Sequence, residues 1–187
     1  LTPYPFQSAL FNSCIEKGLD ITNGGTAPYM THLTAFTGMA NVGDSLAAIK
    51  KAVFDDKKIT MEQLIDALDK NFEGEERILN ILRSAPKFGN DDDYVDSIMI
   101  EVNKHAADTV TKHKIFLGAK NVTSAQGMTA NIPLGQVVGA LPDGRKAGEP
   151  LSEGGISPYQ GRNMSGPTAT MRSVAKLDHV KMSHGSV

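Results

Sequence analysis

Glycine is distributed so unevenly along this chain that it divides the sequence into two unlike parts. Eleven of the 18 glycines lie in residues 118–187, and seven lie in residues 1–117. Dense glycine interrupts helices and lets one stretch of backbone pass close to another or to a ligand. The sequence therefore predicts an α/β chain whose first part is mainly helical and whose second part is rich in short strands and loops.

Composition indicates a soluble globular chain and no particular chemistry. The 187 residues are 40% hydrophobic, which is enough for one domain with a core, and 19 basic against 21 acidic side chains argue against a nucleic-acid surface. A single cysteine excludes an intramolecular disulfide and fits a reducing, cytoplasmic location. No apolar run approaches the roughly 18 residues of a membrane span. Because the chain does not begin with methionine, we expect a piece of a longer protein.

In the first part, apolar residues at helical spacing predict five helices. The most definite signal is a capping box, in which the Thr60 and Gln63 side chains each bond the other residue's backbone N–H. Asn90 and the acidic residues after it supply capping groups for the longest helix, and Pro86 ends the helix before it. The expected ranges are 6–15, 42–53, 61–72, 78–85 and 95–110, with a buried extended segment between residues 26 and 37.

The second part opens with an uncharged stretch of small residues, 123–131, which favours a buried strand facing a ligand and ending before Pro133. Residues 142–144 predict a tight turn. A glycine-rich loop follows at 148–166, and loops of this length without regular structure are usually functional or disordered. We expect a last short strand at residues 174–177. Charged pairing is expected to hold the loop in one shape, among Arg145, Glu149, Glu153 and Arg162.

Motifs for common cofactors and nucleophiles are missing from the sequence. Residues 139–146 approach a phosphate-binding loop but lack the required lysine followed by a hydroxyl residue. His105, Asp108 and His113 fan over too wide an arc of one helix to bind a single metal ion. Cys14 falls on the apolar stripe of its helix, which indicates a packed cysteine rather than a nucleophile.

Several segments together resemble the glycyl radical enzymes, the family of pyruvate formate-lyase, the B12-independent glycerol and propanediol dehydratases, choline trimethylamine-lyase and hydroxyproline dehydratase. The resemblance covers essentially the whole chain. Its strongest segments are 129–135 (TANIPLG), 143–148 (DGRKAG) and 166–177 (GPTATMRSVAKL), with further matches at 14–25 and 41–46. Any one of these segments alone would not be specific.

The resemblance implies a fold of which this chain holds a part. The family fold is a ten-stranded α/β barrel made of two half-barrels, in which a loop with the catalytic cysteine meets a C-terminal loop with the radical glycine. Cys14 stands in a different setting from that cysteine, and no radical-glycine motif precedes Val187. We therefore expect residues 1–187 to be a single fragment of the second half-barrel, without the catalytic-cysteine loop and the radical-glycine domain. The fragment alone is expected to be inactive, with no catalytic residue and no metal ligand.

The resemblance also implies a substrate segment, a cofactor and partners. Gln126, Gly127 and Met128 match positions that face the substrate in diol dehydratases, where a tyrosine and an aliphatic residue line the cavity. The missing tyrosine argues against a glycerol-like or propanediol-like substrate. The implied cofactor is a protein glycyl radical, installed by a separate activase that uses S-adenosylmethionine and an iron–sulfur cluster. The full-length enzyme is expected to be a cytoplasmic homodimer that acts on a small molecule in anaerobic metabolism, without nucleic-acid or membrane partners.

Three functions stay open on these grounds. The first is a radical lyase or dehydratase that abstracts hydrogen and then cleaves a C–O or C–X bond. The second is a relative within the family, either an acyltransferase like pyruvate formate-lyase or a radical decarboxylase. The third is a non-catalytic half-barrel that binds a partner chain across its exposed strand edges. The residues at positions 126–128 in the folded pocket would help to separate the family members.

Overall fold

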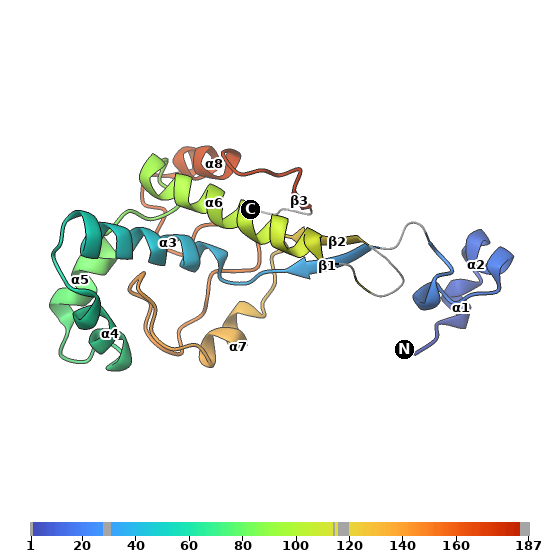
Figure 1. Ribbon diagram of the computed structural model, residues 1–187, viewed down its shortest axis with the longest axis horizontal. Coiled ribbons are helices and arrows are strands. Elements are labelled where there is room, and N and C mark those ends of the chain that lie inside the picture. Colours follow the sequence, from blue (N-terminus) through green and yellow to red (C-terminus); the bar gives the residue numbers. More distant parts are fainter. Residues whose placement is uncertain (1, 28–30, 114, 116–119, 184–187) are drawn as a thin grey trace.

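A small parallel sheet with helices packed on it forms the centre of the computed structural model, which describes residues 2–27, 31–113, 115 and 120–183 (Figure 1). The strands are β1 (Thr31–Ala35), β2 (Lys120–Ser124) and β3 (Met182–Ser183), in the order β1-β2-β3. The register places Thr34 opposite Thr123, and Thr123 opposite Met182. Parallel neighbours need long crossover connections, which the helices between the strands supply.

Eight α-helices are described along the chain. They are α1 (Pro5–Ser8), α2 (Asn12–Lys17), α3 (Met39–Ile49), α4 (Met61–Asp69), α5 (Glu76–Ser84), α6 (Asp93–Lys112), α7 (Asn131–Gln136) and α8 (Pro167–Ala175). A 3₁₀ turn at Ile21–Asn23 follows α2, and a π-helical turn at Lys50–Asp55 continues α3.

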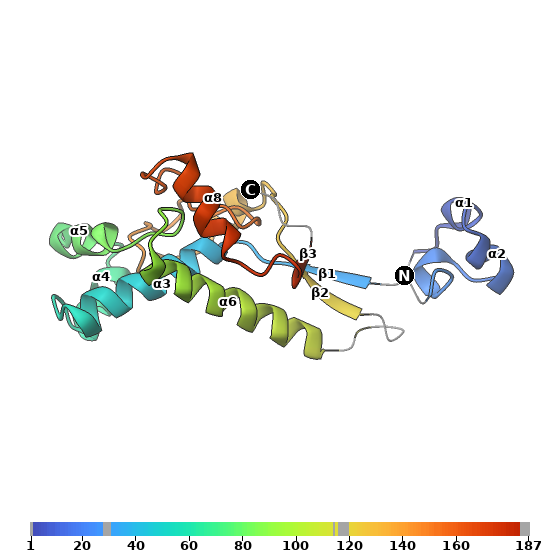
Figure 2. The same cartoon turned by 90° about the horizontal axis from the view of Figure 1, so that it is seen from above.

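The main core lies between α3, α6, α8 and the sheet. Figures 1 and 2 show α3 and α6 running side by side away from the strands. The two helices approach so closely that a Cβ at Gly43 would lie 2.0 Å from the Met99 sulfur. The buried residues of this core are Ala40, Ala47, Phe88, Val95, Met99, Ala107, Ala125, Ile156, Val174, Leu177 and Met182.

A second apolar cluster joins the end of α3 to α4 and α5. Its members include Leu64 on α4, Leu82 on α5, and Phe72 in the turn between these helices. The Thr60–Gln63 capping box is present at the start of α4, as predicted. The predicted end of α5 before Pro86 and the capping of α6 by Asp92 are also confirmed.

The expected helix over 6–15 is wrong, because the chain forms two short helices there. The Ser8 hydroxyl donates to the Asp20 carboxylate and accepts from the Ile21 N–H, so it ties α1 to the following 3₁₀ turn. Such side-chain bonds compete with a continuing helix. Phe6 and Leu10 are exposed as a result, whereas Cys14 is buried.

Helix α3 buries a different face from the predicted one. Val42 and Leu46 are exposed among the described residues, and the buried face carries Gly43 and Ala47. Small residues let α3 reach α6, so the steric demand of close packing outweighs the larger apolar side chains.

The expected strand over 123–131 ends at Ser124, and residues 131–136 form α7 instead. Pro133 stands in the first turn of α7, where proline is tolerated because its missing N–H would have no helical partner. The strand expected at 174–177 is also wrong. Residues up to Ala175 belong to α8, which begins with Pro167 after Gly166, an arrangement typical of a helix start.

Candidate functional site

The predicted substrate segment lies at the carboxyl edge of the parallel sheet. Residues 125–128 follow the end of β2, and residues 36–38 follow the end of the neighbouring β1. In open and closed α/β folds this edge is where ligands bind, because the loops that leave the strands meet there. Gln126 and Gly127 are exposed among the described residues, and Met128 is half-buried.

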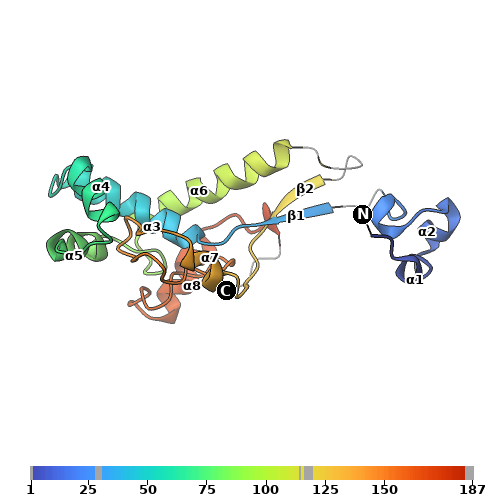
Figure 3. The same ribbon diagram turned by 90° about the horizontal axis from the view of Figure 1, so that it is seen from below.

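A segment of the glycine-rich loop, residues 151–156, packs directly behind residues 126–128. A Cβ at Gly154 would lie 2.4 Å from the Gln126 carbonyl oxygen and 3.1 Å from the Met128 Cγ. Figure 3 shows this loop and α7 beside the start of α3. The fold therefore brings together the predicted substrate segment and a loop that is close to it in space but not in sequence.

Hydrogen bonds fix the 151–156 segment on two sides. On the α3 side, the Ser152 N–H donates to the Asn41 Oδ1 over 2.6 Å, and the Gly38 N–H donates to the Ser152 carbonyl over 3.1 Å. On the α7 side, Leu151 and Asn131 exchange a pair of bonds, 3.1 Å from the Leu151 N–H and 3.0 Å from the Asn131 Nδ2.

Asp143 is the centre of a buried polar network behind this segment. Its side chain is fully buried and accepts hydrogen bonds from the Asn41 Nδ2 over 2.6 Å and from the Arg145 N–H over 2.8 Å. The Arg162 guanidinium lies 3.0 Å from the same carboxylate. Asn41 thereby links the 142–144 turn to Ser152, and the turn itself is closed by a bond from the Gly144 N–H to the Leu141 carbonyl, as predicted.

Arg145 stabilises the loop through hydrogen bonds that were not predicted from the sequence. The expectation of pairing with Glu149 and Glu153 carboxylates is wrong, since those carboxylates accept from the Lys146 N–H and the Ser157 hydroxyl. The fully buried Arg145 guanidinium instead donates to backbone carbonyls, because five N–H groups in a fork can satisfy several acceptors of an irregular loop at once. Its acceptors are the carbonyls of Gly135, Val138, Gly139, Glu149 and Pro150.

Asp44 on α3 is a second buried carboxylate next to the network. One oxygen accepts from the Phe88 N–H over 2.8 Å, and the other lies 3.7 Å from the Arg162 guanidinium without a hydrogen-bond partner among the described residues. Burial raises the pKa of Asp44 to about 7, against the opposing effects of the Phe88 N–H and of the Lys87 and Arg162 charges. Burial also lowers the pKa of Lys87 to about 8.

Perturbed pKa values often mark catalytic groups, but Asp44 does not reach a ligand. Its side chain is fully buried, against the Phe88 N–H and the Arg162 guanidinium. Asn41 and Asp44 therefore act as packing and positioning groups. Neither role was predicted from the sequence, although polar side chains at helical spacing beside Gly43 and Ala47 mark the buried face of α3.

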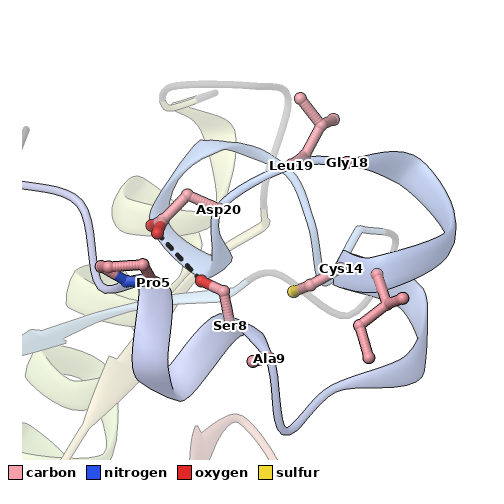
Figure 4. A pocket seen from close by; sticks show the side chains of 8 residues that line it. Pro5, Ser8, Ala9, Cys14, Gly18, Leu19 and Asp20 are labelled. Carbon is pink, nitrogen blue, oxygen red and sulfur yellow. Dashed lines mark hydrogen bonds between the residues drawn. The ribbon is translucent and has the colours of Figure 1, made fainter.

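An open concavity of about 360 Å³ lies elsewhere, in the N-terminal unit, which comprises α1, α2 and the 3₁₀ turn (Figure 4). The Asp20 carboxylate accepts from the Thr22 hydroxyl and N–H and from the Ser8 hydroxyl, and these bonds lower its pKa to about 2. Cys14 also lines it, but its sulfur is packed so tightly that a Cβ at Gly25 would lie 2.5 Å from it. We therefore interpret the residues around this concavity as structural and not as a ligand-binding site.

The described residues contain no cluster of histidine, cysteine or carboxylate groups that could hold a metal ion. Asp108 is ion-paired with Lys181, 2.8 Å away, and His105 and His113 are exposed.

Within the same described ranges, no helix is both long and apolar enough to cross a bilayer. Residues 125–128 and 36–38, which the structure describes at the sheet edge, include no histidine, cysteine or carboxylate.

Comparison with known proteins gives consistent matches over nearly the whole chain. Residues 1–135 match the family described as pyruvate formate lyase-like. The chain is 44% identical to trans-4-hydroxy-L-proline dehydratase of Clostridioides difficile over 180 residues, which cover 96% of this chain and 23% of that protein. It is 49% identical to isethionate sulfite-lyase of Bilophila wadsworthia over 138 residues, 74% of this chain and 16% of that protein.

Solved structures agree with these sequence matches. The glycerol-bound B12-independent glycerol dehydratase from Clostridium butyricum superimposes with a TM-score of 0.92 at 42% identity, over 98% of this chain and 23% of that chain. Hydroxyproline dehydratase from Clostridioides difficile, with its substrate bound, gives a TM-score of 0.90 at 44% identity. The chain thus spans about a quarter of the length of the proteins that it resembles.

Proposed function

Since the chain belongs to the pyruvate formate lyase-like family of glycyl radical enzymes, we propose that it is part of a radical lyase that eliminates water or another leaving group from a small polar molecule. Its relatives that support this reaction class are named for dehydrating trans-4-hydroxy-L-proline and for releasing sulfite from isethionate. The observation that carries the proposal is the position of residues 126–128 at the carboxyl edge of the parallel sheet, backed by a fixed loop.

Residues 126–128 would bind and orient the substrate. The Gln126 amide offers two N–H donors and a carbonyl acceptor, so it suits a hydroxyl, carboxylate or sulfonate oxygen. Gly127 leaves room for a substrate to approach the backbone, and the flexible thioether of Met128 provides an adaptable apolar wall. A polar contact, an open space and an apolar wall are typical of a site for a small hydroxylated molecule.

The radical chemistry does not fit this chain's own cysteine. Cys14 is 3% exposed and lies in the N-terminal unit, whereas residues 126–128 lie at the sheet edge. We assign the hydrogen-abstracting radical to other segments of the longer protein and its installation to a separate S-adenosylmethionine-dependent activase. A homodimer and a cytoplasmic location are parts of the same proposal.

The test is to express the complete protein that contains this sequence anaerobically with its activase. Electron paramagnetic resonance measures the glycyl radical, and mass spectrometry measures product from trans-4-hydroxy-L-proline, isethionate and glycerol, each supplied separately. The proposal predicts a radical and elimination from at least one of these compounds. A protein that acquires no radical and only binds a partner chain would support the non-catalytic alternative instead.

A pair of matched variants then tests the role of the segment. Gln126→Ala is expected to raise KM about tenfold, the effect of losing about one hydrogen bond to the substrate. Gln136→Ala makes the same change at an exposed position at the end of α7, and it should leave KM unchanged. Equal KM values for the two variants would remove Gln126 from the site.

A further inference from the structure

Gly154 approaches residues 126–128 closely, and its backbone conformation does not require a glycine. Gly154 is buried, and its φ lies outside the left-handed region, so an alanine could adopt its conformation. However, the site has no space for the alanine Cβ. A Cβ would lie 2.4 Å from the Gln126 carbonyl oxygen, and 3.1 and 3.3 Å from the Cγ and Cε of Met128. The first of these atoms is backbone, so the clash cannot be relieved by a side-chain rotation alone.

The segment that carries Gly154 cannot retreat from this clash. Ser152 is bonded to Asn41 and Gly38, and Ile156 is anchored in the main core with 4% exposure. On the other side, α7 packs so tightly that a Cβ at Gly135 would lie 2.3 Å from the Glu149 carbonyl oxygen. Gln126, by contrast, is exposed to solvent. When the two segments are forced apart, the substrate segment is the one that moves.

We propose that Gly154 is a positioning and specificity-determining residue, which sets how far residues 126–128 project into the substrate cavity. The inference rests on the proposed function, because it assumes that these residues contact the substrate. The 151–156 segment is the fixed support, and the absence of a side chain at Gly154 sets the depth of the cavity wall. Gly154 itself touches no substrate and acts through Gln126 and Met128.

The test uses Gly154→Ala in the complete, activated enzyme, assayed with trans-4-hydroxy-L-proline, isethionate and glycerol. We expect KM for the compound that the wild type converts to rise at least tenfold, while kcat changes less than threefold. KM should change more than kcat because residues 126–128 bind the substrate, whereas other parts of the protein contact its reacting atoms. The radical signal should equal that of the wild type, which shows that the variant is folded and activated.

Gly139→Ala is the matched control. Gly139 also has an ordinary φ, and a Cβ built on it meets nothing within 4 Å among the described residues, so KM, kcat and the radical signal should all be unchanged. An unchanged KM for Gly154→Ala in an enzyme whose wild type is active would overturn the inference. A wild type that converts none of the three compounds would count against the proposed function instead.

A second variant covers the case in which Gly154→Ala does not fold. Asn131→Ala removes the side-chain bond to the Leu151 carbonyl and leaves the backbone bond between the same residues in place. The support is loosened without any steric insertion, so KM is expected to rise about threefold with kcat retained. A KM equal to that of the wild type would contradict a positioning role for the segment.

Discussion

The α4–α5 region and the loop between α7 and α8 both contain fully buried side chains, but those side chains differ in kind. In the first region they are apolar, with Leu64 and Leu82 at 1% and 0% exposure. In the second they are charged, with Asp143 and Arg145 both at 0%. The helices satisfy their own backbone groups, so their contacts need only exclude water. The loop has little regular structure, so its carbonyls need partners from side chains.

This difference predicts how much a substitution in each region lowers the stability of the protein. In the helical region a lost contact leaves a cavity, whose cost depends on its size. In the loop a lost polar side chain removes donors from backbone carbonyls, and each carbonyl that is left without a donor costs free energy of its own. The loop also packs against residues 126–128, so under the proposed function its order is needed for substrate binding as well as for folding.

The sharpest test of the comparison is Arg145→Met. It keeps an apolar stem but removes the guanidinium, which donates to five carbonyls. The carbonyls of Gly135, Val138 and Pro150 keep another donor, whereas those of Gly139 and Glu149 lose the donor described for them. The free energy of unfolding should therefore fall by about 5 kcal/mol. Urea denaturation of the protein at pH 7 measures it. Arg77→Met, an exposed site with one 3.4 Å bond to the Lys58 carbonyl, should cost less than about 0.5 kcal/mol. Similar losses for both variants would refute the role given to Arg145.

The pH dependence of stability should reflect the buried carboxylate of Asp44, which lies next to the polar network of the loop. Because burial raises the pKa of Asp44 from 3.8 to about 7, the folded state binds a proton that the unfolded state releases. This contribution is complete below pH 4 and is lost as the pH rises to 7, a change of up to about 4 kcal/mol. Lys87, Arg162 and Asp143 are the charged groups that face Asp44.

Asp44→Asn is the variant that isolates this effect. Asparagine can still accept from the Phe88 N–H but does not titrate, so the stability difference between wild type and variant should shift across pH 4–7 in favour of the variant. Unfolding curves collected at each pH give the difference directly. A difference that stays constant over this range would show that Asp44 has an ordinary pKa.

In the helical region, Leu82→Ala should cost about 3 kcal/mol, because it removes a fully buried side chain between α5 and its neighbours. Leu82→Met keeps the volume and should cost less than about 1.5 kcal/mol. Thermal or urea unfolding of both variants is the measurement. If Leu82→Ala costs as much as Arg145→Met, the two regions do not differ in the way described.

The smallest expected effect concerns the start of α4. Thr60→Ala removes the acceptor of the Gln63 N–H and should cost about 1 kcal/mol, and Thr60→Ser should restore most of it. The same unfolding assay serves here. A neutral Thr60→Ala would mean that the α4–α5 region is held by its apolar core alone.

The contrast also explains how far the sequence alone predicts the fold. Local signals sufficed for α4, α5 and α6, since a capping box, a following proline and apolar spacing lie within one segment. They failed for α7 and for the partners of Arg145, because those depend on contacts between distant residues. They also failed on α3, where the demand for close approach to α6 reversed the expected buried face.

The candidate site was predictable in part for the same reason. Gln126, Gly127 and Met128 were found through a resemblance between short segments, and their role in binding stays a prediction. The bond between Asn41 and Ser152 and the close fit at Gly154 could not be predicted, because a buried hydrogen bond or a missing side chain has meaning only once the two segments are side by side. Only the fold shows which glycine in a glycine-rich loop is required for space.

The most direct test of the central claim, that buried polar groups fix the loop, is hydrogen exchange of its backbone amides in the intact protein. The N–H groups of Leu141, Gly144 and Gly148 donate to backbone carbonyls within the loop, and the Ser152 N–H donates to the Asn41 Oδ1. We predict that these amides exchange as slowly as those of α5, although they lie in no helix or strand. Exchange at the rate of an unprotected chain would contradict the claim, and with it the fixed support proposed for the substrate segment.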